Sequence, residues 1–286
     1  MAGSAGMQST TAGTNHPAGV QVHFYIPTVT EKDSVALRFY DSKDQLLKTV
    51  SSHGKKDKLV AKTGANLYNW NTELDGAARL PGMILWWANL SGPKAVPGNY
   101  RVELDVNGQQ QSQPITIMVA PTSEATVANM QAQFTFVQAV NKTVDQAHTS
   151  IKNIRLFNEK LAGFKTIYGD RTEAGIKNML KLADSMKTKF GDIEKALYQT
   201  QNRSGQDPLN FPIRLTNKLA HLNALVTVGD FAPTQQDELV RKELTTAIEK
   251  ELATFNSILE TDVKAFNEQF RKLELDYLIL EKDKND

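Results

Sequence analysis

The spacing of apolar residues changes once along the chain, near Pro121, and this change divides the sequence into two regions. From Ala18 to Val119, apolar residues alternate with polar ones in short runs separated by Gly, Pro, Asn and Asp, a pattern typical of half-buried β-strands. The expected strands cover residues 20–26, 35–39, 46–50, 67–70, 83–88, 100–106 and 115–119. About seven strands in roughly one hundred residues is the scale of an immunoglobulin-like β-sandwich, which we predict for residues 18–120.

After Ala120-Pro121 the apolar residues recur at intervals of three and four, which is the period of α-helices. Each series forms a narrow apolar seam that needs a partner helix to bury it. Asp170 and Glu173 resemble a capping box for the second helix, and Thr234 is expected to cap the last one. Residues 123–286 are therefore predicted to form an antiparallel bundle of about four long helices, which makes the chain a multidomain protein, all-β followed by all-α.

The seams assign apolar side chains from different helices to one core. Six of them are Val144, Ile151, Met186, Phe190, Leu259 and Phe266. If all are buried, truncating Phe190 or Phe266 to alanine is expected to cost about 3–5 kcal/mol. The alternative is that one seam is a docking groove for another chain or domain, in which case its phenylalanine is partly exposed in the isolated chain.

Composition narrows the classes of partner. Lys and Arg number 33 against 32 for Asp and Glu, so the net charge of +1 gives no field for gathering nucleic acid or anionic lipid. Cysteine is absent, and no apolar run of about 18 residues predicts a membrane-spanning helix. We expect neither a nucleic-acid partner nor membrane insertion, and we interpret residues 1–17 as a tag and disordered N-terminus that lacks an export signal.

Catalytic signatures are absent from the sequence. It contains no His-Glu-x-x-His helix, no phosphate-binding loop, no Gly-x-Gly-x-x-Gly and no Gly-x-Ser-x-Gly. The histidines are scattered singly without metal-ligand spacing, and they are His16, His23, His53, His148 and His221. We interpret them as structural or solvated, and we expect no catalytic residue, no metal and no cofactor in this chain. A hydrolase site within the chain is the least favoured hypothesis, because no facing pair of carboxylates can be singled out.

The most unusual local feature is the pair Trp86-Trp87, with Tyr68 upstream of it. Adjacent residues of a strand point to opposite faces, so the two indoles cannot both fill one core and one is expected to be exposed. An exposed indole can stack on a sugar ring, or it can pack against the helices or against another domain. We favour packing, and we keep Trp87, Trp86 and Tyr68 as candidate ligand-binding residues.

Several motifs, in this order, resemble one bacterial family. They are the segments 64–70 (Gly-Ala-Asn-Leu-Tyr-Asn-Trp), 81–86 (Pro-Gly-Met-Ile-Leu-Trp), 92–100 (Gly-Pro-Lys-Ala-Val-Pro-Gly-Asn-Tyr) and 215–220 (Leu-Thr-Asn-Lys-Leu-Ala). This order resembles the C-terminal region of sortilin-like, BNR-repeat β-propeller proteins, which are often labelled glycosyl hydrolases. Where that family usually has Trp-Asp, this chain has Trp70-Asn71, and Ala120-Pro121-Thr122 replaces its Asp-Pro-Arg linker.

The resemblance implies a place for the chain in a larger protein. In that family an immunoglobulin-like module follows the propeller and precedes a helical segment. It therefore implies a non-catalytic accessory module of a secreted, periplasmic or cell-envelope protein that packs against the upstream β-propeller or mediates a protein interaction. A carbohydrate-binding module that uses an exposed tryptophan is the alternative. If the parent protein is a glycosyl hydrolase, the resemblance places its active site in the propeller.

Overall fold

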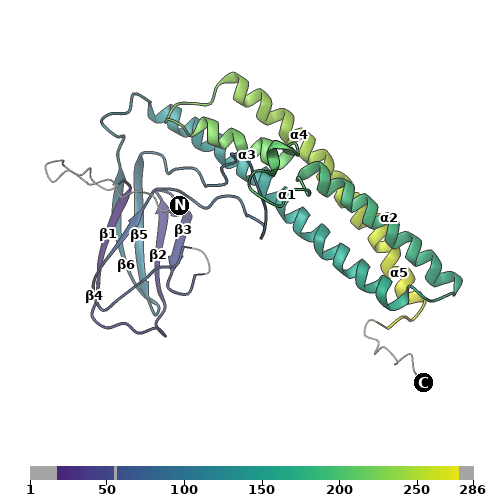
Figure 1. Ribbon diagram of the computed structural model, residues 1–286. Coiled ribbons are helices and arrows are strands. Elements are labelled where there is room, and N and C mark those ends of the chain that lie inside the picture. Colours follow the sequence, from purple (N-terminus) through teal and green to yellow (C-terminus); the bar gives the residue numbers. More distant parts are fainter. Residues whose placement is uncertain (1–17, 55–56, 277–286) are drawn as a thin grey trace. The chain divides into compact units, whose positions relative to one another are not determined.

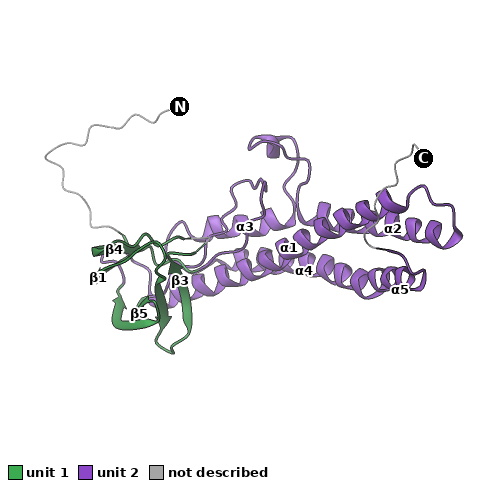
Figure 2. Ribbon diagram, turned by 90° about the horizontal axis from the view of Figure 1, so that it is seen from below, with its two compact units in different colours: residues 1–74, 97–118 green, residues 75–96, 119–286 purple. Residues whose placement is uncertain are grey.

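The computed structural model describes residues 18–54 and 57–276. The chain divides into two compact units, which Figure 2 shows in green and purple. The sheet unit consists of residues up to 74 together with 97–118, and the helical unit consists of residues 75–96 together with those from 119 onward. The units differ from the expected domain ranges in that residues 75–96 group with the helices. The interpretation of residues 1–17 lies outside the described residues.

The sheet unit contains two antiparallel sheets (Figure 1). The smaller sheet pairs β1 (Val20–Ile26) with β4 (Gly64–Trp70). The larger sheet has the strand order β3-β2-β5-β6, with β3 at Leu46–Ser51, β2 at Val35–Asp41, β5 at Gly98–Val106 and β6 at Gln109–Ile117. The period-two pattern thus predicted the sheet-rich character of this region.

The core of the sheet unit lies between the inward faces of these strands. Phe39 on β2 and Trp70 on β4 are both fully buried, and their ring centroids lie 4.4 Å apart, so the two sheets contact each other through aromatic rings. Val35, Leu37 and Val50 are also fully buried. Side chains alternate between the two faces of a strand, and this periodicity places these apolar residues inside the unit.

A network of ion pairs holds part of the larger sheet. Arg38 on β2 donates hydrogen bonds to Glu103 at 3.0 Å and Asp105 at 2.9 Å, both on the neighbouring β5. Arg101 lies 4.0 Å from the ring centroid of Tyr40 and donates to the other oxygen of Glu103. These charges are matched within the sheet, and cross-strand pairs of this kind help to fix its register.

One expected strand is wrong. Residues 83–88 form no strand, and the described part of the chain contains six strands rather than about seven. The segment runs irregularly because its backbone groups bond to helix side chains instead of to a neighbouring strand, as described below.

The helical unit is built along one long helix, α1 (Val127–Tyr168), whose 42 residues span about 63 Å. The other helices are α2 (Ala174–Leu197), α3 (Leu215–Val226), α4 (Gln235–Ile258) and α5 (Lys264–Lys272), with a π-helical turn, η2, at Leu259–Val263 between the last two. In Figures 1 and 2, α3 and α2 occupy successive parts of the length of α1, while α4 and α5 continue one another beside it. None of the helices among the described residues is both long and apolar enough to cross a membrane.

The helix starts show which sequence signals were correct. Thr234 caps α4 as predicted, because its hydroxyl accepts from the backbone N–H of Asp237 and the Asp237 carboxylate accepts from the backbone N–H of Thr234. The capping box expected from Asp170 and Glu173 is wrong. Helix α2 begins at Ala174, and Glu173 makes no side-chain capping bond.

The helical core contains most of the predicted residues. Val144, Ile151, Met186 and Phe190 are buried, and they belong to one apolar cluster. Leu259 and Phe266 are only partly buried and pack against that cluster from its edge. The prediction of full burial is therefore wrong for these two side chains, which lie at and beyond the π-helical turn.

Candidate functional site

The candidate site is carried by residues 75–96, which follow β4 in the sequence and fold with the helical unit. Three apolar side chains of this segment, Ala77, Leu80 and Met83, are buried in the same cluster as the helix seams. Gly76 permits the chain to turn back on itself, because a Cβ atom at this position would lie 1.9 Å from the carbonyl oxygen of Leu90. The segment is thus an integral part of the helical core.

Asn217 of α3 fixes the middle of the segment. Its Oδ1 accepts from the backbone N–H of Trp86 at 2.7 Å, and its Nδ2 donates to the Trp86 carbonyl at 2.8 Å. Asn217 is 4 % exposed, so these bonds form where water has little access. The side-chain amide takes the place of a neighbouring strand, which is why an apolar run that looks like a strand forms none.

Two further asparagines extend this arrangement. Asn223 donates to the carbonyl of Asn89 at 3.2 Å and to Oδ1 of Asn141 at 2.8 Å, and Asn141 donates to the carbonyl of Ser91 at 2.7 Å. Both side chains are buried. Helices α1 and α3 therefore hold the same stretch of irregular backbone through a connected set of amides.

The start of the segment is held by α1 and by the residue that follows α2. The backbone N–H of Ala78 donates to Asp145, and His148 Nδ1 bonds to the Ala78 carbonyl. The N–H of Ile84 donates to the hydroxyl of Tyr198 at 2.9 Å. Burial lowers the pKa of His148 from its ordinary value, so the neutral ring with its proton on Nδ1 fits this site.

This framework presents Trp87 to solvent. The residue has a φ of 50°, in the left-handed region that bulky side chains rarely adopt, and its side chain is 72 % exposed. Its ring is nearly parallel to that of Trp86, with centroids 5.8 Å apart, and to that of His221, with centroids 6.3 Å apart. His221 on α3 also bonds to the Trp87 carbonyl at 3.1 Å.

Exposed apolar residues continue from this point along α3. Leu225 lies one helical turn after His221 and is therefore its neighbour on the helix surface. Leu225 is 52 % exposed, and Val228 just beyond the helix is 86 % exposed. We call Trp86, Trp87, His221 and Leu225 the Trp87 surface.

The structure brings together two of the three candidate ligand-binding residues. Trp86 is half-buried beside Trp87, whereas Tyr68 lies on β4 in the sheet unit. Tyr68 is half-buried near Phe39, with ring centroids 6.2 Å apart, and burial raises its pKa. Sequence reasoning missed His221, because no local pattern connects it with a tryptophan 134 positions earlier.

The chemistry offered by the Trp87 surface is that of contact rather than reaction. Its side chains are two indoles, one imidazole and one aliphatic group, which suit stacking and apolar burial. Within residues 18–54 and 57–276, no group of three or more His, Asp or Glu side chains is arranged to hold a metal ion.

Comparison with known proteins gives no match: no family model, no curated protein and no solved structure is significantly similar to this chain.

Proposed function

We propose that this chain is a non-catalytic accessory module of a secreted or cell-envelope protein, and that the Trp87 surface docks against another folded domain of the same protein. One observation carries the proposal. The side chain of Trp87 is 72 % exposed although its backbone is strained. The backbone on either side of it is held in place by hydrogen bonds to asparagine side chains of α1 and α3. Strain that persists because the surroundings impose it is characteristic of binding sites.

The surroundings of Trp87 favour a protein partner. Leu225 and Val228 add exposed aliphatic area along α3, and contiguous apolar area on a protein surface marks contact sites. A tryptophan at the centre of such an area has the character of an interface hot spot. The sheet unit, for which we propose the immunoglobulin-like sandwich fold, is the linking module in this account.

The proposed partner is the β-propeller that the family resemblance places upstream. The test is to produce that region from the native gene and to titrate it with the chain carrying Trp87→Ala. Leu156→Ala is the matched control, because Leu156 is an exposed apolar residue of α1 outside the Trp87 surface. We expect Trp87→Ala to weaken binding about tenfold or more and Leu156→Ala to leave it unchanged. Equal affinities for the two variants, or a native gene without an upstream domain, would contradict the proposal.

The second candidate function is carbohydrate binding. It is favoured by the near-parallel orientation of Trp86, Trp87 and His221, because sugar rings stack on flat aromatic faces. Affinity gel electrophoresis on a panel of polysaccharides tests it. Retardation of the wild-type chain that Trp87→Ala abolishes and Leu156→Ala preserves would support this function over docking.

A further inference from the structure

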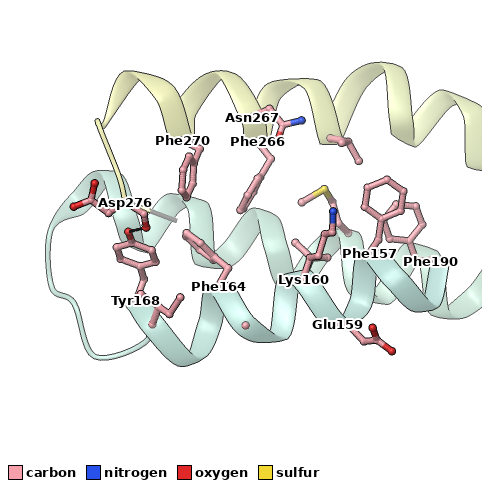
Figure 3. Close-up of a pocket in the computed structure, with 15 residues that line it drawn as sticks. Phe157, Glu159, Lys160, Phe164, Tyr168, Phe190, Phe266, Asn267, Phe270 and Asp276 are labelled. Atoms are coloured by element: carbon pink, nitrogen blue, oxygen red, sulfur yellow. Dashed lines mark hydrogen bonds between the residues drawn. The ribbon is translucent and has the colours of Figure 1, made fainter. Parts of the chain in front are cut away.

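A cavity in the helical unit is separate from the Trp87 surface. It has a volume of about 550 Å³ and lies among α1, α2, η2 and α5 (Figure 3). Pockets that bind small molecules typically have volumes of about 300–1,000 Å³, and this cavity falls within that range. A stable protein interface is a much larger surface, of about 800 Å² on each partner. The cavity is therefore suited to a small ligand.

Aromatic side chains form much of its wall. Phe164 is buried, and its ring packs edge-on against Phe266 at a centroid distance of 5.0 Å and faces Phe270 at 6.3 Å. Phe157, whose ring stacks on that of the fully buried Phe190, lines the cavity at the end away from Phe270. Partial exposure of Phe266 is the feature that the sequence associated with a docking groove rather than a closed core.

The π-helical turn at Leu259–Val263 bears on the same cavity. It separates α4 from α5, and Val263 from this turn lines the cavity together with Phe266. A π-turn inserted in a helix is frequently found at a functional site, because it changes the direction of the side chains that follow. The turn thus directly precedes α5, whose Phe266 and Phe270 line the cavity.

One positive charge points into the cavity. In Figure 3 the Lys160 ammonium lies between Phe157 and Phe266, whereas the carboxylate of Glu159 points away. Lys160 makes no hydrogen bond or ion pair with the described residues. The carboxylate of Asp262, on the π-helical turn, is paired with Lys189. Among the described residues that line the cavity, which also include Glu159 and Asp276, Lys160 is therefore the one cation, and it has no ion-pair partner among them.

We propose that this cavity binds an amphiphile with one negative charge, of the long-chain carboxylate class. The alkyl chain lies along the phenylalanines, and the carboxylate pairs with the Lys160 ammonium. Tyr168 closes the far end, where its hydroxyl donates to the Asp276 carbonyl at 2.6 Å. This proposal does not depend on the function of the Trp87 surface.

Calorimetric titration with dodecanoate below its micelle concentration tests the proposal. Dodecan-1-ol and dodecyltrimethylammonium serve as neutral and cationic probes of the same length. We expect one dodecanoate per chain, with a higher affinity than for the alcohol and the lowest affinity for the cation. Lys160→Gln should weaken dodecanoate binding about three- to tenfold without changing the affinity for the alcohol. The matched control is Lys152→Gln, because Lys152 is an exposed lysine of α1 that does not line the cavity.

A second variant tests the cavity without removing a charge. Val263 lines it and is only partly buried, so the larger side chain of Val263→Trp should occupy part of the space and weaken the binding of all three probes. The proposal would be overturned if dodecanoate did not bind, if Val263→Trp left its binding unchanged, or if Lys160→Gln and Lys152→Gln bound it with equal affinity. Binding that appears only after deletion of residues 277–286 would also overturn it, by assigning the cavity to that segment.

Discussion

Replacing Asn217 with alanine is the sharpest test of how residues 75–96 are held. The substitution removes both hydrogen bonds to Trp86 and leaves a half-buried N–H and a half-buried carbonyl without those partners. Each unsatisfied backbone group costs about 1–3 kcal/mol. Partial access of water to Trp86 reduces this sum, so we expect the free energy of unfolding to fall by about 2–4 kcal/mol.

Urea denaturation followed by far-ultraviolet circular dichroism measures this loss, because the helical unit dominates the signal. Hydrogen exchange at the Trp86 amide provides a local readout, and its protection should disappear in the variant. Asn210→Ala is the control, since Asn210 is exposed and its side chain makes no hydrogen bond to the described residues. A loss below about 0.5 kcal/mol together with unchanged protection of Trp86 would refute the assigned role of Asn217.

Three further predictions concern the helical unit. Phe190→Ala should cost about 3–5 kcal/mol in urea denaturation and Phe266→Ala clearly less, because only Phe190 is fully buried; equal costs would contradict the open cavity. Burial lowers the pKa of His148, so the unfolded chain binds the proton more readily and stability should fall as the pH drops below about 6.5, a dependence that thermal melts of His148→Gln should lack. Gly76→Ala should cost more than about 1 kcal/mol, because its methyl group would collide with a backbone carbonyl, and an unchanged melting temperature would refute this close approach.

Local periodicity was sufficient for the regular elements. The alternation through Val35, Leu37 and Phe39 correctly predicted the inward face of β2. The three-and-four spacing through Val144 and Ile151 correctly predicted the buried face of α1. These patterns succeed because each element buries one face against its own unit. The immunoglobulin-like topology and the family resemblance remain predictions.

Long-range contacts account for what the sequence did not reveal. Residues 83–88 are as apolar as a strand, yet their partner is an amide on a helix 131 residues away from Trp86. One of the two indoles was expected to be exposed, but the pattern did not show that it is Trp87, and the pairing of Trp87 with His221 depends on the same distant helix. Likewise, Phe266 keeps the spacing of a core residue but borders a cavity, and the spacing does not reveal the π-helical turn that precedes it.

We propose that Trp87 is an exposed contact residue that another domain covers in the native protein. Hydroxyl-radical footprinting, with mass spectrometry of the peptide that contains Trp87, measures its accessibility in this chain alone and in the full native polypeptide. We expect strong oxidation of Trp87 in the isolated chain and marked protection in the full polypeptide, with Leu156 reacting equally in both. Equal oxidation of Trp87 in the two proteins would show that no other domain covers it.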